Sequence, residues 1–280
     1  MNLSNKIIVI TGAGGVICSE IARNLAKNGA KIALLNRTLE KAQKVAEQIN
    51  SDSQVKSSGG CAKAYQVNVV EKSTLEAAHE QILKDFGACD ILINGAGGNN
   101  PAATTSNETA ISGETYEKDF FALEESGVRG VFDLNFLGTF LPTQVFAKDM
   151  IGKKGCSILN ISSMNAFTPL TKIPAYSGAK AAVSNFTQWL AVHFAPSDIR
   201  VNAIAPGFFV TDQNRSLLFD AEGKPTARTE KILAATPMKR FGEVSELLGA
   251  VDLLLDEEKA SFITGVVLPI DGGFNAYSGV

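Results

Sequence analysis

Tyr176 and Lys180 are the residues of this sequence whose types and spacing most directly suggest chemistry. Side chains four positions apart lie on one face of a helix. A free tyrosine titrates at about pH 10, too high for a proton-transfer group at neutral pH. An ammonium group beside the hydroxyl favours the phenolate and lowers that pKa. The pair therefore predicts a group that gives a proton to, or takes one from, a reacting oxygen.

Ser163 extends this pattern, because it closes the apolar run 156–163 thirteen residues before Tyr176. The run predicts a buried strand, and open α/β sheets bind their ligands at the carboxyl ends of their strands. A serine, a tyrosine and a lysine at one such end suit oxidation of an alcohol or reduction of a carbonyl. A Tyr–Lys pair by itself is often only a helix-surface feature, so the interpretation depends on a nucleotide loop upstream.

Strand and helix patterns alternate along the chain, which predicts an α/β fold with a parallel, doubly wound sheet and right-handed crossovers. We expect the polar segment 51–60 to be a surface loop, residues 128–151 to form one long helix, and 206–230 to be an irregular binding loop. The expected strands are 6–11, 31–36, 62–69, 90–94, 156–163, 199–205 and 265–270.

Composition bounds the function classes. The 280 residues are 45% hydrophobic and 20% charged with a net charge of −3, which fits one α/β domain spanning 1–280 and argues against a nucleic-acid partner. No apolar run approaches the roughly 20 residues that span a bilayer. Four scattered cysteines and two histidines predict neither a disulfide framework nor a metal site. We expect a cytoplasmic protein.

A glycine turn follows the first expected strand, with Gly12, Gly14 and Gly15 leading into a helix that opens at Val16 and Ile17. Such a turn lets backbone N–H groups and a helix N-terminus meet a pyrophosphate, so we predict dinucleotide binding. An acidic residue at the end of the second strand would hold the ribose of NAD. Asn36 stands there instead and Arg37 follows, which favours NADP(H) mildly while leaving NAD(H) open.

The chain resembles the short-chain dehydrogenase/reductases over nearly its whole length. The motifs that carry the resemblance stand in the family's order: Thr11-Gly12, Asn94-Gly95-Ala96-Gly97, Asn135, Ser163, Tyr176 with Lys180, and Pro206-Gly207. The resemblance implies a seven-stranded Rossmann sheet flanked by helices, hydride transfer with a nicotinamide, and a homotetramer.

The family's roles carry over to matching positions. Tyr176 would be the acid/base, and Lys180 would lower its pKa and hold the nicotinamide ribose. Ser163 would bind the reacting oxygen, and Asn135 would hold a water in the proton relay. Further cofactor contacts are implied at Asn68, Val69, Asn94 to Gly97, Pro206, Gly207, Phe209 and Thr211.

Two positions depart from the family pattern. Val16 and Cys18 stand where the family's later glycines fall, and Asn68 stands where many members carry aspartate. We interpret Cys18 as a small core residue rather than a reactive thiol. An asparagine can still bond an adenine, so Asn68 leaves cofactor binding plausible.

Within the family, the stretches GAGGNNP, FDLNFLGTFLP, NISSMNAFTPLTKIPAYS and DGGFNAYSGV resemble the mannonate oxidoreductases (fructuronate reductases). This implies interconversion of D-fructuronate and D-mannonate. Gluconate 5-dehydrogenases and other sugar dehydrogenases share most of the frame. A catalytically silent nucleotide-binding regulator would not need the intact Asn-Ser-Tyr-Lys set. A sugar-nucleotide epimerase would need more than the 74 residues that follow position 206.

Substrate contacts are expected from Ser163 and Tyr176, together with Asn99, Asn165, Lys172 and Phe208. The polar middle of the excursion between 98 and 134 either meets sugar hydroxyls or is an exposed detour. Lys172, or Arg215 in the later loop, is our candidate partner for a substrate carboxylate.

Overall fold

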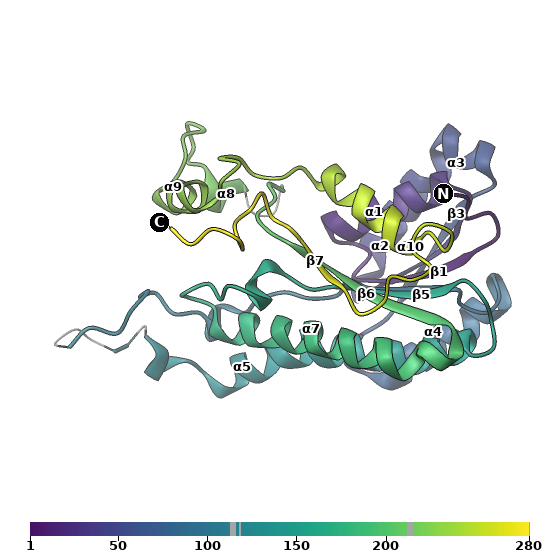
Figure 1. The fold of residues 1–280 in the computed structure, drawn as a ribbon, viewed down its shortest axis with the longest axis horizontal. Coiled ribbons are helices and arrows are strands. Elements are labelled where there is room, and N and C mark those ends of the chain that lie inside the picture. The colour runs from purple at the N-terminus through teal and green to yellow at the C-terminus, as the bar shows by residue number, and fades with distance from the viewer. Residues whose placement is uncertain (113–115, 118, 212–214, 280) are drawn as a thin grey trace.

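A seven-stranded parallel sheet in the order β3-β2-β1-β4-β5-β6-β7 forms the centre of the computed structural model, which describes residues 1–112, 116–117, 119–211 and 215–279 (Figure 1). Every neighbouring pair of strands is parallel. The predicted doubly wound sheet is confirmed. The strands are β1 Ile7–Thr11, β2 Lys31–Asn36, β3 Cys61–Gln66, β4 Ile91–Asn94, β5 Cys156–Ile161, β6 Ile199–Pro206 and β7 Val267–Ile270.

Helices cover both faces of the sheet, with α1, α2 and α10 above it and α4, α5 and α7 below it in Figure 1. Two apolar cores result, because successive strand residues point to opposite faces. Ile8 and Ile10 of β1 pack toward α1 and α10, whereas Val9 packs toward α4 and α6. The longer helices are α1 Val16–Lys27, α2 Leu39–Ser51, α4 Lys72–Asp85, α5 Glu125–Phe132, α6 Gly138–Phe146, α7 Pro174–Phe194, α9 Ala227–Ala235 and α10 Leu248–Leu255.

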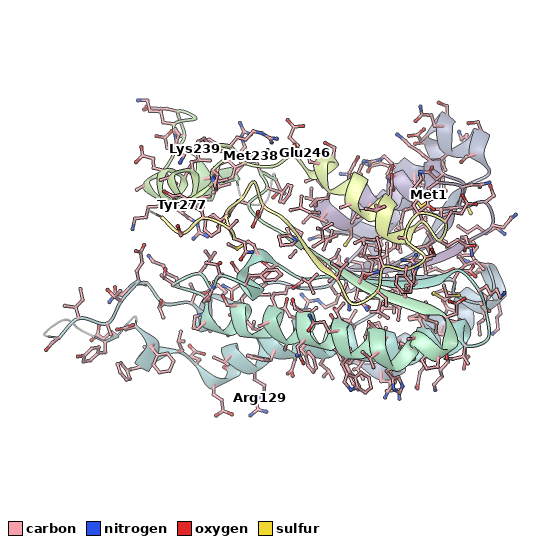
Figure 2. All side chains as sticks on the ribbon, in the orientation of Figure 1. Met1, Arg129, Met238, Lys239, Glu246 and Tyr277 are labelled. Atoms are coloured by element: carbon pink, nitrogen blue, oxygen red, sulfur yellow. The ribbon has the colours of Figure 1, made fainter. Side chains whose placement is uncertain are left out.

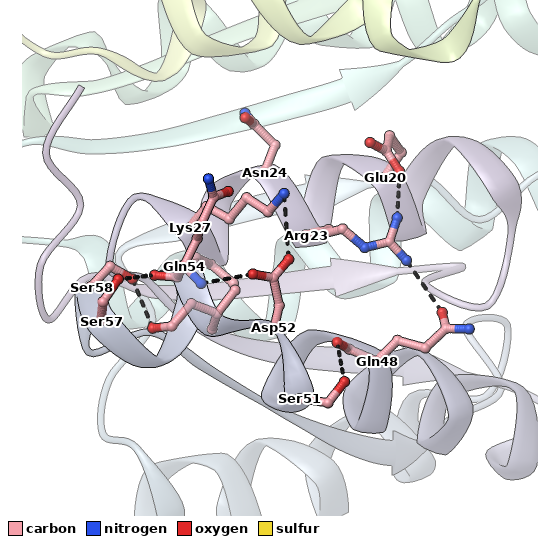
Figure 3. Close-up of polar contacts among 12 residues, drawn as sticks. Glu20, Arg23, Asn24, Lys27, Gln48, Ser51, Asp52, Gln54, Ser57 and Ser58 are labelled. Atoms are coloured by element: carbon pink, nitrogen blue, oxygen red, sulfur yellow. Dashed lines mark hydrogen bonds and ion pairs between the residues drawn. The ribbon is translucent and has the colours of Figure 1, made fainter.

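The expectation of a surface loop at 51–60 is wrong, because this segment contains a short helix, α3 (Ser53–Ser58). The Asp52 carboxylate accepts the backbone N–H of Gln54 at 2.8 Å and pairs with Lys27 of α1 at 3.4 Å (Figure 3). The pKa of Asp52 is lowered, chiefly by the hydrogen bond from the Gln54 N–H and to a smaller extent by Lys27. Gly59 ends the helix at φ 78°, in the left-handed conformation that favours glycine. The segment that we expected to be a polar loop is therefore a capped helix, joined to α1 by an ion pair.

The single helix expected over 128–151 is interrupted. Between α5 and α6, residues Asp133–Leu137 form a π-helical turn. Asn135 sits in it, fully buried, and donates to the carbonyl of Val131 at 2.8 Å and to that of Gly98 at 2.7 Å. A π turn re-aims a side chain and occurs often at functional sites. Hydrophobic spacing could not reveal it, because the apolar pattern continues through the turn.

The segment 206–230 is only partly irregular, since it contains α8 (Arg215–Leu218) and the start of α9. The Thr226 side chain caps α9 by accepting the N–H of Thr229. In Figure 1 this part and the C-terminal tail lie beyond the end of the sheet, over the N-terminal end of α7. The segment is therefore placed where a binding loop is needed.

A buried polar ladder ties the centre of the sheet to α6 and α7. Asn94 of β4 donates to Thr143 of α6 and to Asn160 of β5, both at 2.9 Å. Asn160 in turn donates to Thr187 of α7 at 2.9 Å. Asn94, Asn160 and Thr187 are 0–1% exposed. Because buried polar groups are costly when unpaired, this ladder fixes how β4, β5 and the two helices meet.

We expect Asn160→Ala to lower the free energy of unfolding by about 2–4 kcal/mol, because Asn94 and Thr187 both lose a buried partner. For a chain of this size that shifts Tm by roughly 2–4 °C per kcal/mol. Thermal unfolding followed by circular dichroism measures it. Ser157→Ala is the matched control on β5, because the buried Ser157 hydroxyl has no hydrogen-bond partner among the described residues. Equal destabilisation by the two substitutions would contradict the ladder.

Candidate active site

The glycine turn after β1 has the shape that a dinucleotide requires. Gly12 has φ 66°, and a Cβ there would lie 2.8 Å from the backbone of Ala96. The Thr11 hydroxyl accepts the N–H groups of Gly95 and Ala96 at 3.1 and 3.2 Å, which holds the ends of β1 and β4 together. Two strand ends thus meet with no side chain between them. This cradle fits a pyrophosphate at the N-terminus of α1.

A cleft of about 350 Å³ continues from this cradle along the carboxyl end of the sheet. Cys18 is buried in its wall, and burial raises the pKa of its thiol to about 12, so the residue is neutral and the core interpretation is confirmed. A Cβ on Gly95 would collide with the Cys18 sulfur, which makes glycine necessary there. Nine predicted cofactor residues line the cleft or its cradle: Gly12, Gly15, Val16, Ile17, Gly95, Gly207, Phe209 and Thr211, with Ala96 against Gly12.

At the adenosine end, Asn36 braces the glycine turn. Its Oδ1 accepts the N–H of Gly14 at 3.3 Å, and its Nδ2 donates to the carbonyl of Thr38 at 2.8 Å. Both halves of the amide are therefore engaged locally, which the sequence did not indicate. Arg37 is exposed, and Lys41 lies against Gly14.

Two predicted cofactor contacts, Asn68 and Val69, have other partners. The Asn68 amide donates to Glu71 at 2.6 Å. Val69 is 6% exposed and packs against Gly138 of α6. Its side chain belongs to the core, so any contact it makes with a cofactor is through its backbone. The Asn94 side chain is likewise committed to the buried ladder, and it shapes the cleft from beneath rather than touching a ligand.

Lys180 and Asn135 converge on Gly97. A Cβ on Gly97 would lie 2.7 Å from Asn135 Oδ1 and 3.1 Å from Lys180 Nζ, so only glycine leaves both groups in place. Asn135 Oδ1 also accepts the N–H of Gly98 at 3.2 Å. The Lys180 ammonium donates to the carbonyl of Ile161, the last residue of β5, at 2.8 Å. Three segments far apart in sequence therefore meet around one amine.

Ser163 and Tyr176 complete the cluster. Ser163 lies two residues beyond β5, where its hydroxyl accepts the N–H of Asn165 at 3.3 Å. It also lies close enough to the Tyr176 hydroxyl to lower the pKa of the tyrosine. Pro174 at the first position of α7 starts the helix that carries Tyr176, and Lys180 Nζ lies 5.7 Å from the centre of the tyrosine ring. The predicted serine, tyrosine and lysine are therefore neighbours.

The electrostatics differ from the sequence prediction. Burial raises the pKa of Tyr176, and the neighbouring Ser163 hydroxyl only partly offsets this shift. Burial also lowers the pKa of Lys180 to about 8, and its ammonium faces the Ile161 carbonyl and the tyrosine ring. Lys180 is not among the groups that shift the pKa of Tyr176 in this structure, so the predicted lowering of that pKa by Lys180 is not seen. A tyrosine that stays protonated at neutral pH is suited to give a proton rather than take one.

Of the predicted substrate residues, Lys172 and Phe208 line a pocket beside the cleft, whereas Asn165 and Asn99 do not. Asn165 is 5% exposed, and its buried Oδ1 has no hydrogen-bond partner among the described residues, but the residue lines neither the cleft nor the neighbouring pocket. Lys172 and Phe208 line a pocket of about 400 Å³ next to the cleft. Asn99 is exposed and donates to Thr104 at 2.8 Å. Arg215 lies 5.5 Å from the Phe219 ring and does not line this pocket.

Sequence reasoning missed Arg228, which lines both the cleft and this pocket. It stands on α9, a helix that begins inside the stretch we expected to be irregular. No motif marks it, and only the folded position of α9 brings it to the site. Over the ranges that the structure describes, no helix is long and apolar enough to cross a membrane, and no group of three His, Cys, Asp or Glu residues is arranged to hold a metal ion.

Comparison with known proteins agrees with this geometry. Residues 6–221 match the family model described as short chain dehydrogenase. An uncharacterised oxidoreductase from Haemophilus influenzae is 62% identical over 280 residues, covering all of this chain and 96% of that protein. The 5-keto-D-gluconate 5-reductase of Escherichia coli K12 is 31% identical over 97% of this chain and 96% of that protein.

Among solved structures, a candidate D-mannonate oxidoreductase from Haemophilus influenzae with bound NAD superposes with a TM-score of 0.94. It is 62% identical, and the match covers all of this chain and 98% of that one. With the family model, these relatives and the clustered serine, tyrosine and lysine in agreement, the chain belongs to the short-chain dehydrogenase family of oxidoreductases.

Proposed function

We propose that this protein is a nicotinamide-dependent reductase of a sugar acid, interconverting D-fructuronate and D-mannonate. The observation that carries the proposal is the Ser163–Tyr176–Lys180 cluster. Lys180 interacts electrostatically with Cys18 in the wall of the dinucleotide-shaped cleft, and the helix that carries Tyr176 and Lys180 follows directly after Lys172 and Ile173 of the pocket. The candidate D-mannonate oxidoreductase that shares 62% of the sequence supports the choice of substrate. Reduction of 5-keto-D-gluconate is the alternative, which the Escherichia coli relative favours.

When bound, the nicotinamide would supply the hydride. The protein residues would do the rest. Ser163 and Tyr176 would hold the carbonyl oxygen by hydrogen bonds, and the Tyr176 hydroxyl would give its proton to that oxygen as it becomes an alkoxide. Lys180 would then restore the tyrosine proton through the polar path beside Asn135.

We propose that both NAD(H) and NADP(H) are used. The NAD-bound relative supports NAD(H). Arg37 and Lys41 near the glycine turn support tolerance of a 2′-phosphate, so the mild preference for NADP(H) stays a prediction. We further propose a cytoplasmic homotetramer. The exposed Trp189 and Val192 on α7 support assembly through that helix, because large apolar side chains left open on a surface often mark interfaces.

The experiment that tests this proposal follows the absorbance of the reduced nicotinamide in a substrate screen. D-Fructuronate, D-tagaturonate, 5-keto-D-gluconate and D-fructose are each combined with NADH and with NADPH. We expect the highest kcat/KM with D-fructuronate. A higher value for 5-keto-D-gluconate would select the alternative, and no oxidation of either cofactor with any sugar acid would refute the proposal.

A further inference from the structure

The pocket beside the cleft has three walls from distant parts of the chain. One wall is the segment Leu170–Ile173 that precedes α7, the second is α9, and Phe274 of the C-terminal tail adds the third. Phe208 lines both the pocket and the cleft, so the two spaces share a border. Figure 2 shows side chains of α9 and of the tail that ends near Tyr277 above α7, on this side of the molecule. A substrate in the pocket would therefore adjoin the dinucleotide.

The charges of this pocket are mostly positive. Lys172, Arg228 and Lys231 line it with a single acid, Glu108. Lys231 Nζ lies 2.8 Å from the Glu108 carboxylate, and this ion pair lowers the pKa of Glu108. Both partners of the pair are therefore ionised at neutral pH, and Glu108 cancels the charge of Lys231. Lys172 also lowers the pKa of Glu108 but forms no ion pair with it, and Arg228 has no ion-pair partner among the described residues.

Arg228 is the better placed of the two for an anion shared with the reaction centre. It is exposed at the border of pocket and cleft, and within the described ranges no carboxylate forms an ion pair with it. A guanidinium presents two parallel N–H donors that match the two oxygens of a carboxylate. Arg215, the other arginine we considered, faces the ring of Phe219.

We infer that Arg228, with Lys172 across the pocket, binds the carboxylate of the substrate and sets the preference for sugar acids over neutral sugars. This inference rests on the proposed function, because it names the residue that reads the acid group. It also corrects the sequence hypothesis, in which the arginine was Arg215. The backbone N–H of Thr105 donates to the carbonyl of Lys172 at 2.9 Å, which holds that side of the pocket in place.

The test compares D-fructuronate with D-fructose, which carries a hydroxymethyl group in place of the carboxylate. For Arg228→Met we expect the KM for D-fructuronate to rise about tenfold or more, with kcat within about threefold, because a charged hydrogen-bond partner is lost in ground and transition states alike. The KM of Arg228→Lys for D-fructuronate should lie between those of the wild-type enzyme and Arg228→Met, because lysine keeps the positive charge but lacks the two parallel N–H donors of the guanidinium. Lys224→Met is the control, because Lys224 pairs with Glu222 outside the pocket.

A second variant predicts a gain. Glu108→Gln removes the acid that neutralises Lys231, so the KM for D-fructuronate should fall about two- to fivefold while that for D-fructose changes less. Damage to the fold cannot produce an improvement confined to the anionic substrate. This direction separates charge recognition from a structural role of the pocket.

Three results would overturn the inference. Equal losses on D-fructuronate and D-fructose in Arg228→Met would show that the residue does not read the carboxylate. A weakened Kd for NADH with an unchanged KM would assign Arg228 to a cofactor phosphate. An unchanged KM for both D-fructuronate and D-fructose would show that Arg228 does not contact the substrate. By contrast, if the wild-type enzyme reduces no sugar acid, the proposed function itself fails, and this inference fails with it.

Discussion

Replacing Tyr176 by phenylalanine is expected to lower kcat about a thousandfold, because the variant keeps the ring and loses the proton donor. The Kd for NADH, followed by fluorescence titration, should change little, since Tyr176 lies near Ser163 and is not among the residues that line the cleft. Steady-state rates with the best substrate of the screen measure the loss. A nucleotide-binding regulator without catalysis would show no such difference.

The matched control is Tyr65→Phe on β3, where the hydroxyl donates to Asp85 at 2.8 Å away from the cleft. It removes the same atom and one hydrogen bond, at a cost of about 1 kcal/mol in the free energy of unfolding. We expect its kcat to match that of the wild-type enzyme. If Tyr176→Phe retained more than about a tenth of the wild-type kcat, Tyr176 would not be the proton donor.

Lys180→Met is expected to lower activity without lowering stability. The amine is 4% exposed and burial disfavours its charge, so methionine of similar length should leave Tm within about 2 °C or raise it. The same change removes the cation beside Tyr176 and Asn135, so kcat should fall about a hundredfold or more. Calorimetry and steady-state kinetics on one preparation measure both quantities.

Lys153→Met should show the opposite pattern. Lys153 pairs with Asp90 at 2.7 Å before β5, at the end of the sheet remote from the cleft. Its loss leaves a mostly buried carboxylate without its partner, so Tm should fall while kcat stays near that of the wild-type enzyme. Activity loss in Lys180→Met that only followed a lower Tm would indicate a structural role for Lys180.

The sheet and the central cluster could be predicted because their signals are local. Apolar runs bounded by glycine turns identify β1, β2 and β4, and a strand buried on both faces has few alternatives. Tyr176 and Lys180 share a helix, so their spacing alone places them on one face. Ser163 follows a strand whose end the parallel topology brings to the same edge.

What could not be predicted depends on contacts between distant segments. Asp52 caps a helix in a segment that reads as a loop, and its pairing with Lys27 is visible only in the fold. Arg228 reaches the pocket because α9 is folded over Phe208. The pKa of Tyr176 is set chiefly by burial, which the Tyr–Lys spacing does not report. Motifs identified the reacting groups, and packing determined their protonation.

The dependence of the reduction rate on pH tests the central claim most directly, namely that Tyr176 acts as a proton donor. Its raised pKa keeps the hydroxyl protonated through neutrality, and a donor works only while it holds its proton. We predict a kcat for reduction that is constant below neutrality and falls above about pH 8, as Lys180 loses its charge. Tyr176→Phe should lack this fall. A wild-type kcat that instead rises with pH through neutrality would mean that the essential group must first lose a proton, and it would contradict the account.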